Sequence, residues 1–392
     1  MTASLKLGAR LRRRILWEGQ RLSLWWNDTA RMRWHDATQA RRLRVQDGAV
    51  PLARRLAILA IYPNRGLQPS HLATLRHLQG RGYAPLVVSN LPLPEADAAQ
   101  LRPLCWRLIQ RPNYGFDIGG FRAALDWLGP RLDELDRLVL TNDSIWFPIG
   151  PARDWLSVAD DLAKADPAGG PDLIGAVSNG GMARDERSGE WRLDRESPDF
   201  HYCSFALSFG PRVLRDPDFR RFWQQMRLTD DKHEIVRRGE IAISRWVIGR
   251  GYTHAACWDI EGLEARLAAR PLDDLVPLID ALIIPEDPQL RSRRDAFRAS
   301  DQVRDHEAVI RFLMTAIVET GPAYALPAWT LREDGFGFLK KSPLRLDPLG
   351  RQQTLAVLGD TPALLREARE IAGPPTADAA TGRPLADRPD MI

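Results

Sequence analysis

The apolar run before Asn142 ends in three polar residues, Asn142, Asp143 and Ser144. A carboxylate at a strand end can hold a divalent cation, which neutralises the charge that develops on a diphosphate leaving group. Asp143 is therefore a candidate metal ligand and catalytic residue, and its two neighbours are candidate ligand-binding residues. The two acids separated by one residue that are typical of metal-dependent transferases are absent, because Thr141 and Ile145 stand there. The alternative is an Asp-Ser turn with no ligand.

A second candidate is the glycine-rich loop Arg111–Phe121. Asn113 and Asp117 offer hydrogen-bonding side chains, while Gly115 and Gly119 let a ligand approach the backbone closely. The Gly-Lys-Ser/Thr ending of a phosphate-binding P-loop is missing. The same residues could simply cap the helix that follows.

Glu240 begins the third candidate segment. It precedes the apolar run 241–248 and is expected at a helix start, where a carboxylate is favoured and stays ionised. Such a carboxylate can accept a proton from a hydroxyl group, so Glu240 is a candidate general base. The commoner alternative is a helix-start acid without a catalytic role. His201 and His254 could bind phosphate or sugar, although lone histidines are more often structural.

Alternating strands and helices must position these residues. Short apolar runs bounded by turn residues predict strands at 56–62, 85–89, 106–109, 137–141, 173–178 and 204–209. Helices are expected after Ser70 as the N-cap, over Phe121–Leu128 and over Phe219–Met226. This order predicts an α/β fold with a mostly parallel sheet, in which ligands gather beyond the carboxyl ends of the strands.

The composition is ordinary for a folded protein. The 392 residues are 44% hydrophobic and 27% charged, which argues against wholesale disorder. Cys105, Cys203 and Cys257 lack metal-ligand spacing and predict no disulfide framework. No apolar run approaches the roughly 18 residues that span a bilayer, and no secretory signal is recognisable, so a cytoplasmic location is expected.

Basic charge is concentrated near the N-terminus. Residues 1–55 hold thirteen Lys and Arg against four Asp and Glu, although the formal net charge is only +4. Together with Trp17, Trp25, Trp26 and Trp34, this composition suits an anionic membrane surface. The alternative is a solvated arm whose tryptophans pack on the main domain. Nucleic-acid binding is not expected, because no signature of a nucleic-acid module is present.

Taken in order, the candidate segments resemble the rhamnan synthesis protein F family. That family has an Asn-x-Gly-x-Asp-x-Gly loop, an Asn-Asp-Ser strand end, a His-x-x-Ser-aromatic segment and a C-terminal Phe-Leu-Lys motif. The resemblance covers about residues 54–345. Its motifs stand here as Asn113, Gly115, Asp117 and Gly119; as Asn142, Asp143 and Ser144; as His201, Ser204 and Phe205; and in the segment Gly337–Leu344.

The resemblance implies a glycosyltransferase of polysaccharide synthesis that uses dTDP-rhamnose or a related donor. The chain is also similar to the GT-A glycosyltransferase plan, which implies that Tyr62, Ser89 and Asn90 at two strand ends cradle the nucleotide. Asp143 then takes the place of the acid that holds Mg²⁺ or Mn²⁺, and Glu240 that of the catalytic acid. A lipid-linked saccharide at the inner membrane is the expected acceptor. The alternative is a noncatalytic scaffold that binds glycan or a partner protein.

Four parts of the chain are expected. Residues 1–53 would form a basic, Trp-rich helical arm, and residues 54–260 a GT-A-like domain that binds the nucleotide sugar. Residues 261–371 would form a helical extension. Residues 372–392, rich in Pro, Ala, Asp and Gly, would form a disordered tail.

Overall fold

The computed structural model describes residues 28–39, 42–150, 153–165, 170–185, 189–285 and 287–373. The first 27 residues of the predicted basic arm and the predicted tail beyond Gly373 lie outside these residues. Within the range predicted as the arm, residues 44–47 form an edge strand of the central sheet.

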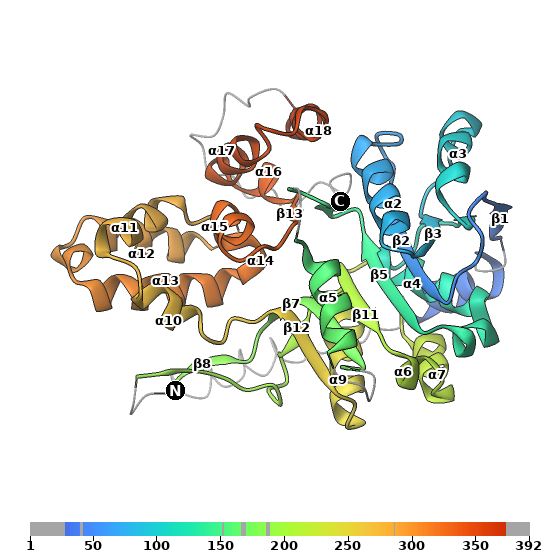
Figure 1. Cartoon of the computed structure of the whole chain (residues 1–392), viewed down its shortest axis with the longest axis horizontal. Helices are drawn as coiled ribbons and strands as arrows, with labels where there is room; N and C mark the ends of the chain where they lie inside the picture. The colour runs from blue at the N-terminus through green and yellow to red at the C-terminus, as the bar shows by residue number, and fades with distance from the viewer. Residues whose placement is uncertain are drawn as a thin grey trace, which may run out of the picture.

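A nine-stranded sheet forms the centre of the described part of the chain (Figure 1). Its order is β1-β4-β3-β2-β5-β11-β7-β10, and β12 also pairs with β7. The strands are β1 (Arg44–Asp47), β2 (Arg55–Ile61), β3 (Ala84–Ser89), β4 (Arg107–Gln110), β5 (Arg137–Asn142), β7 (Leu173–Asn179), β10 (His201–Tyr202), β11 (Ala206–Phe209) and β12 (His254–Trp258).

The sheet is mostly parallel. β2 pairs in parallel with both β3 and β5, and β4 pairs in parallel with β3. β11 is antiparallel to both of its neighbours, so β7 beyond it again shares the direction of β5, as does β12. The predicted fold class is confirmed, while β1, β10 and β12 were not predicted as strands.

Helices cover both faces of the sheet because successive strand residues point to opposite sides. Leu59 and Ile61 pack with α2 and α3, whereas Ile58 and Ala60 pack with α4. The helices of this part are α2 (Pro69–Gly80), α3 (Glu95–Leu101), α4 (Phe116–Leu128), α5 (Trp155–Lys164), α6 (Pro211–Leu214), α7 (Pro217–Gln225), α8 (Lys232–Ile235) and α9 (Ala242–Gly249).

The chain beyond β12 is largely helical, as predicted, and Figure 1 shows these helices beside and above one end of the sheet. They are α10 (Leu263–Ala268), α11 (Leu272–Ala281), α12 (Pro288–Arg298), α13 (His306–Thr320), α14 (Pro322–Ala325), α15 (Pro327–Arg332), α16 (Pro343–Leu346), α17 (Pro348–Val357) and α18 (Pro362–Ala372). Among the described residues, no helix is both long and apolar enough to cross a bilayer.

A short strand of the C-terminal segment pairs with the chain that follows β5. The short strand β13 (Leu339–Lys340) pairs antiparallel with β6 (Ile145–Trp146), directly after the predicted Asn-Asp-Ser strand end. Leu339 and Trp146 belong to one apolar cluster with α16, α17 and α18. Two further short strands, β8 (Met182–Arg184) and β9 (Trp191–Leu193), form a hairpin.

One predicted helix start is wrong. Ser70 was expected as the N-cap of α2, but the helix begins at Pro69 and its N-cap is Gln68. Proline suits the first helical position because its missing N–H has no partner there in any case. The hydroxyl of Ser70 instead donates to Glu367 of α18, at 2.8 Å.

Candidate functional site

The predicted site lies at the edge of the sheet where the strand order reverses. From β2 the chain proceeds outward through β3 and β4, and then returns to place β5 on the other side of β2. In open α/β sheets ligands bind beyond the carboxyl ends of the strands at such a reversal. Tyr62 follows β2 and Asp143 follows β5, so the two residues stand on either side of this point.

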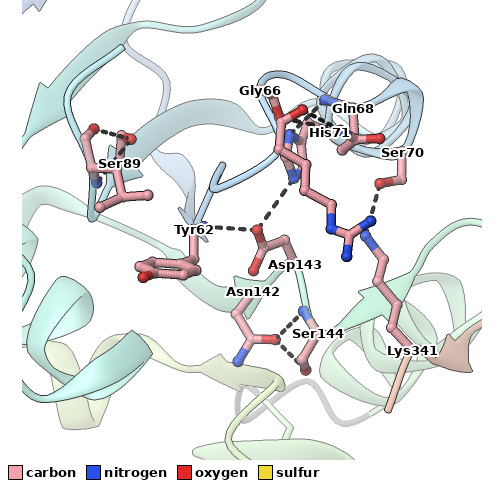
Figure 2. Close-up of polar contacts among 12 residues, drawn as sticks. Tyr62, Gly66, Gln68, Ser70, His71, Ser89, Asn142, Asp143, Ser144 and Lys341 are labelled. Carbon is pink, nitrogen blue, oxygen red and sulfur yellow. Dashed lines mark hydrogen bonds and ion pairs between the residues drawn. The ribbon is translucent and has the colours of Figure 1, made fainter. Parts of the chain in front are cut away.

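Asp143 ties the two strand ends together (Figure 2). Its Oδ2 accepts a hydrogen bond from the Tyr62 backbone N–H at 2.7 Å and lies 3.2 Å from Nε2 of His71. Nδ1 of His71 accepts from the Gln68 N–H at 3.1 Å, so the Nε2 proton is the one that faces Asp143. Burial by itself raises the pKa of Asp143, but these hydrogen bonds and the charge of Lys341 outweigh it and lower the pKa.

Asn142 links the Asn-Asp-Ser strand end to the glycine-rich loop. Its Nδ2 donates to the carboxylate of Asp117, and its Oδ1 accepts from the backbone N–H of Ser144 at 3.0 Å and from the Ser144 hydroxyl at 2.6 Å. Burial raises the pKa of Asp117, and the charge of Glu240 raises it further. The hydrogen bond from Asn142 offsets only part of this rise.

Strand register brings the histidine segment to the same place. β11 pairs antiparallel with β5, with Ala206 opposite Thr141, so the turn that carries Ser204 lies beside the end of β5. The backbone N–H of Ser204 donates to Oε2 of Glu240 at 2.5 Å. Nε2 of His201 lies 3.4 Å from the other oxygen of Glu240.

Glu240 and His201 shift each other's pKa toward the charged form. Burial by itself raises the pKa of Glu240, but the hydrogen bond and charge of His201 and the N–H of Ser204 outweigh it and bring the pKa down to about 2. Burial by itself lowers the pKa of His201, but Glu240 and the carbonyl of Asp199 outweigh it, so that the pKa is raised.

The predicted position of Glu240 at a helix start is wrong. The helical segment begins at Lys232, with Asp231 as its N-cap, and continues through a π-helical turn, η4 (Val236–Ile241), into α9. Glu240 lies inside this turn, a local geometry that is frequent at functional sites. Its carboxylate is therefore stabilised by Ser204 and His201 and not by a free helix N-terminus.

Two lysines flank the end of β5. Lys340 belongs to β13, and Lys341 follows it directly. The Nζ of Lys340 lies 3.3 Å from the Ser144 hydroxyl and 4.0 Å from the ring centroid of Phe205. The backbone N–H of Lys341 donates to the Ser144 carbonyl at 3.0 Å. The Nζ of Lys341 lies 2.9 Å from a carboxylate oxygen of Glu367. Neither lysine was predicted as a site residue.

Other predicted site residues are engaged in holding loops together. The Ser89 hydroxyl donates to the Leu91 carbonyl at 2.6 Å. The side chain of Asn90 accepts from Arg111 at 2.7 Å and donates to the Phe116 carbonyl at 3.1 Å. Both residues are buried; Asn90 fastens the end of β3 to the glycine-rich loop, whereas Ser89 holds only the turn that follows β3.

Two glycines of the glycine-rich loop are required by backbone conformation and by close packing. Gly115 has φ of +76°, and its N–H donates to Asp230 at 3.2 Å. A Cβ on Gly119 would lie 2.0 Å from the Tyr114 carbonyl oxygen. Asn113 is exposed, and no hydrogen bond joins its side chain to the other site residues that the structure describes.

The predicted cation at Asp143 has few ligands available. Among the described residues, no group of three or more His, Cys, Asp and Glu side chains could hold a metal ion. His71 is of a residue type that can bind metals, but its ring is hydrogen-bonded to the Asp143 carboxylate itself. Mg²⁺ and Mn²⁺ prefer several oxygen ligands. Asp143 alone therefore supplies few of these ligands, and a cation there would also need phosphate oxygens of a bound nucleotide.

The sequence contained weak signals for the residues that were missed. His71 lies in the first turn of a predicted helix, one of the elements whose N-termini gather at the ligand edge of such sheets. Lys340 belongs to the C-terminal Phe-Leu-Lys motif, but the pairing of β13 with β6 spans nearly 200 residues of sequence and leaves no local signature.

Comparisons with known proteins give one extended family match. A family model described as Rhamnan synthesis protein F matches residues 86–317, more than half of the chain. The match includes Asp117, Asp143 and Glu240 but ends before Lys340.

One curated relative and one solved structure are also similar. "Uncharacterized protein y4gN" of Sinorhizobium fredii is 28% identical over 221 residues, and the aligned part is 56% of this chain and 53% of that protein. The chain thus spans about half the length of this relative. The crystal structure of the glycosyltransferase GlyE of Streptococcus pneumoniae TIGR4 aligns with a TM-score of 0.30 and 14% identity, over 67% of this chain and 65% of that one.

Proposed function

The chain belongs to the rhamnan synthesis protein F family, and we propose that it is a glycosyltransferase of polysaccharide synthesis. The proposed donor is dTDP-rhamnose or a related nucleotide sugar. The proposed acceptor is a lipid-linked saccharide, reached by a cytoplasmic enzyme at the surface of the inner membrane. The GT-A plan remains the proposed description of its nucleotide-binding domain.

One observation carries the proposal. Asp117 and Asn142 are hydrogen-bonded at the end of β5, and Glu240 lies close by, because a Cβ on Gly239 before it would stand 2.9 Å from Ile118, the residue after Asp117. Carboxylates of different proton affinity at one ligand edge supply what sugar transfer needs, namely a proton acceptor and groups that orient hydroxyls. The Tyr62 amide and the Asp143 carboxylate border the same edge.

The proposed reaction is a single displacement with inversion. The acceptor hydroxyl oxygen bonds to the anomeric carbon while the bond from that carbon to the diphosphate oxygen breaks. The electron pair of the broken bond leaves on the diphosphate, and the hydroxyl proton passes to a carboxylate of the enzyme. The positive charge that develops on the sugar in such a transfer is oxocarbenium-like.

Two carboxylates compete for the role of base. Glu240 is the predicted base, but a pKa of about 2 makes its carboxylate a weak proton acceptor. Asp117 has a raised pKa and lies close enough to Glu240 to sense its charge. We therefore propose Asp117 as the second candidate base, with Glu240 and its partner His201 beside it.

Asp143 takes an orienting role in this proposal. Its Oδ2 is occupied by Tyr62 and His71, while its side chain is 21% exposed at the reversal point. A partly open carboxylate suits a hydroxyl of the donor as its ligand. The cation that was predicted at Asp143 stays a prediction, and the proposed displacement needs no cation there.

Nucleotide binding tests the proposal. Calorimetry with dTDP and UDP is expected to give saturable binding of at least one of them, and purified protein is expected to hydrolyse dTDP-rhamnose or a related donor slowly. Asp143→Asn is expected to weaken nucleotide binding, because it removes the charge that orders Tyr62 and His71.

The exposed ion pair Arg54–Asp136 provides a matched control. Asp136→Asn makes the same chemical change away from the site and should leave nucleotide binding as in the parent protein. Absence of binding by the parent to either nucleotide, with and without manganese, would contradict the enzymatic function and favour a noncatalytic scaffold.

A further inference from the structure

Lys340 is a nearly buried cation without a carboxylate partner. The residue is 8% exposed, and among the described residues no Asp or Glu oxygen lies within 4.0 Å of its Nζ. Its contacts are the Ser144 hydroxyl at 3.3 Å and the faces of Phe205 and Tyr324, whose ring centroids lie 4.0 Å and 5.4 Å away. Burying an ammonium group without a paired anion is unfavourable.

Lys341, the next residue in the chain, differs from Lys340 because it has a carboxylate partner. Successive residues of an extended segment point to opposite sides. Lys341 points away from Ser144 toward Ser70 and Glu367, where its Nζ forms a buried ion pair of 2.9 Å. The charge of Lys341 is therefore satisfied within the protein, whereas that of Lys340 is directed at the proposed site.

The contacts of Lys340 place its ammonium group next to the hydrogen-bonded residues at the end of β5. The Ser144 hydroxyl that it contacts also donates to Asn142, which in turn donates to Asp117. The charge of Lys340 also lowers the pKa of Asp117 relative to what burial alone would give. The ammonium group thus stands at the end of β5, beside the carboxylates of the proposed reaction.

We infer that Lys340 neutralises the diphosphate of the nucleotide-sugar donor and the charge that develops on it as the sugar leaves. The inference rests on the proposed function and adds a residue to which that function assigned no role. Lys340 supplies this positive charge from the protein itself, without a bound cation. A fixed cation at a leaving phosphate stabilises the transition state electrostatically.

Binding of dTDP and dTMP to Lys340→Met tests the inference, with the parent protein and Lys340→Arg measured alongside. The parent is expected to bind dTDP more tightly than dTMP, because the additional phosphate meets the ammonium group. Lys340→Met should weaken dTDP binding by about 10- to 100-fold and dTMP binding much less. Lys340→Arg should retain most of the preference. Lys232→Met removes an exposed lysine and should leave the ratio of the two affinities unchanged.

Chelation separates the lysine from a metal ion. With EDTA present, the parent should keep its preference for dTDP over dTMP. Loss of that preference in EDTA, or equal weakening of both nucleotides in Lys340→Met, would overturn the inference and leave the proposed glycosyl transfer intact. Failure of the parent to bind any nucleotide would overturn both. If Lys340→Met does not fold, Lys340→Gln keeps a polar group near Ser144 and serves in the same comparison.

Discussion

At the scale of single residues, neighbouring carboxylates of the site have opposite tendencies. Glu240 is paired with His201 and keeps its charge down to about pH 2. Burial and the charge of Glu240 instead raise the pKa of Asp117. Environments that drive two carboxyl pKa values apart are a recurrent means of assigning one group to proton transfer and the other to holding charge.

The pH dependence of the rate distinguishes the two candidate bases. If Asp117 is the base, kcat/KM falls as pH decreases through the raised pKa of Asp117, above the ordinary Asp value of about 3.9. Glu240→Gln removes the negative charge that raises this pKa, so the acidic limb should move to lower pH. Asp117→Asn should reduce kcat by about 100-fold or more.

The opposite assignment has a different signature. With Glu240 as the base, its pKa of about 2 leaves the rate independent of pH through the mildly acidic range. In that case Glu240→Gln should reduce kcat by about 100-fold or more, and the acidic limb of the pH profile should not shift. Far-UV circular dichroism and thermal unfolding of both variants would show whether they remain folded.

At the scale of elements, the C-terminal helix α18 holds the start of α2 in place. Glu367 is 1% exposed, and its carboxylate accepts from the Ser70 N–H at 2.9 Å and from the Trp146 indole N–H at 3.0 Å. Its cation is Lys341. His71, the residue after Ser70, contacts Asp143, so this buried cluster connects α18 to the site through a single turn of helix.

Breaking the cluster from one side should destabilise the protein. Lys341→Met leaves the Glu367 carboxylate buried without its cation, and a loss of about 3–5 kcal/mol in the free energy of unfolding is expected. Denaturant unfolding of the full chain measures it. The double variant Lys341→Met with Glu367→Gln removes the buried charge as well and should recover much of the loss. Equal stability of Lys341→Met and the parent would show that the ion pair does not hold α18.

At the scale of the whole molecule, the distribution of charge bears on the surface at which we propose the protein acts. The excess of Lys and Arg is concentrated in residues 1–55, and its first part lies outside the described residues. Trp34, within the described part, is 60% exposed. Basic and aromatic side chains together favour the surface of an anionic membrane, where we propose that the acceptor resides.

Vesicle binding tests this proposal. Replacing Arg12, Arg13 and Arg14 together by Gln should weaken binding to vesicles that contain anionic lipid by about 100-fold, at about 1 kcal/mol for each charge. Co-sedimentation measures the bound fraction, and vesicles of neutral lipid alone provide the comparison. Binding that is equal for the parent and the triple variant, or equal on neutral vesicles, would argue for an arm that only packs on its own domain.

The local sequence was sufficient for what depends on local patterns. Apolar runs and turn residues predicted the parallel strands β2, β3, β5 and β7 to within one or two residues at each end, and helical spacing predicted α4 and α7. The strand order followed in part, because strand–helix–strand units place parallel strands side by side. The glycine-rich loop and the Asn-Asp-Ser end of β5 were therefore expected at one edge of the sheet.

The tertiary structure decided which side chains face one another. The contact of Glu240 with Ser204 depends on the register of β11 and on a π-helical turn, neither of which has a signature in the local sequence. The position of Lys340 depends on the pairing of β13 with β6. Such pairings join residues far apart in the chain, and their free energy arises from packing and hydrogen bonds across the whole fold. Charge, spacing and residue type in the sequence alone therefore placed the glycine-rich loop and the end of β5 at one edge of the sheet, but not His71 and Lys340 beside them.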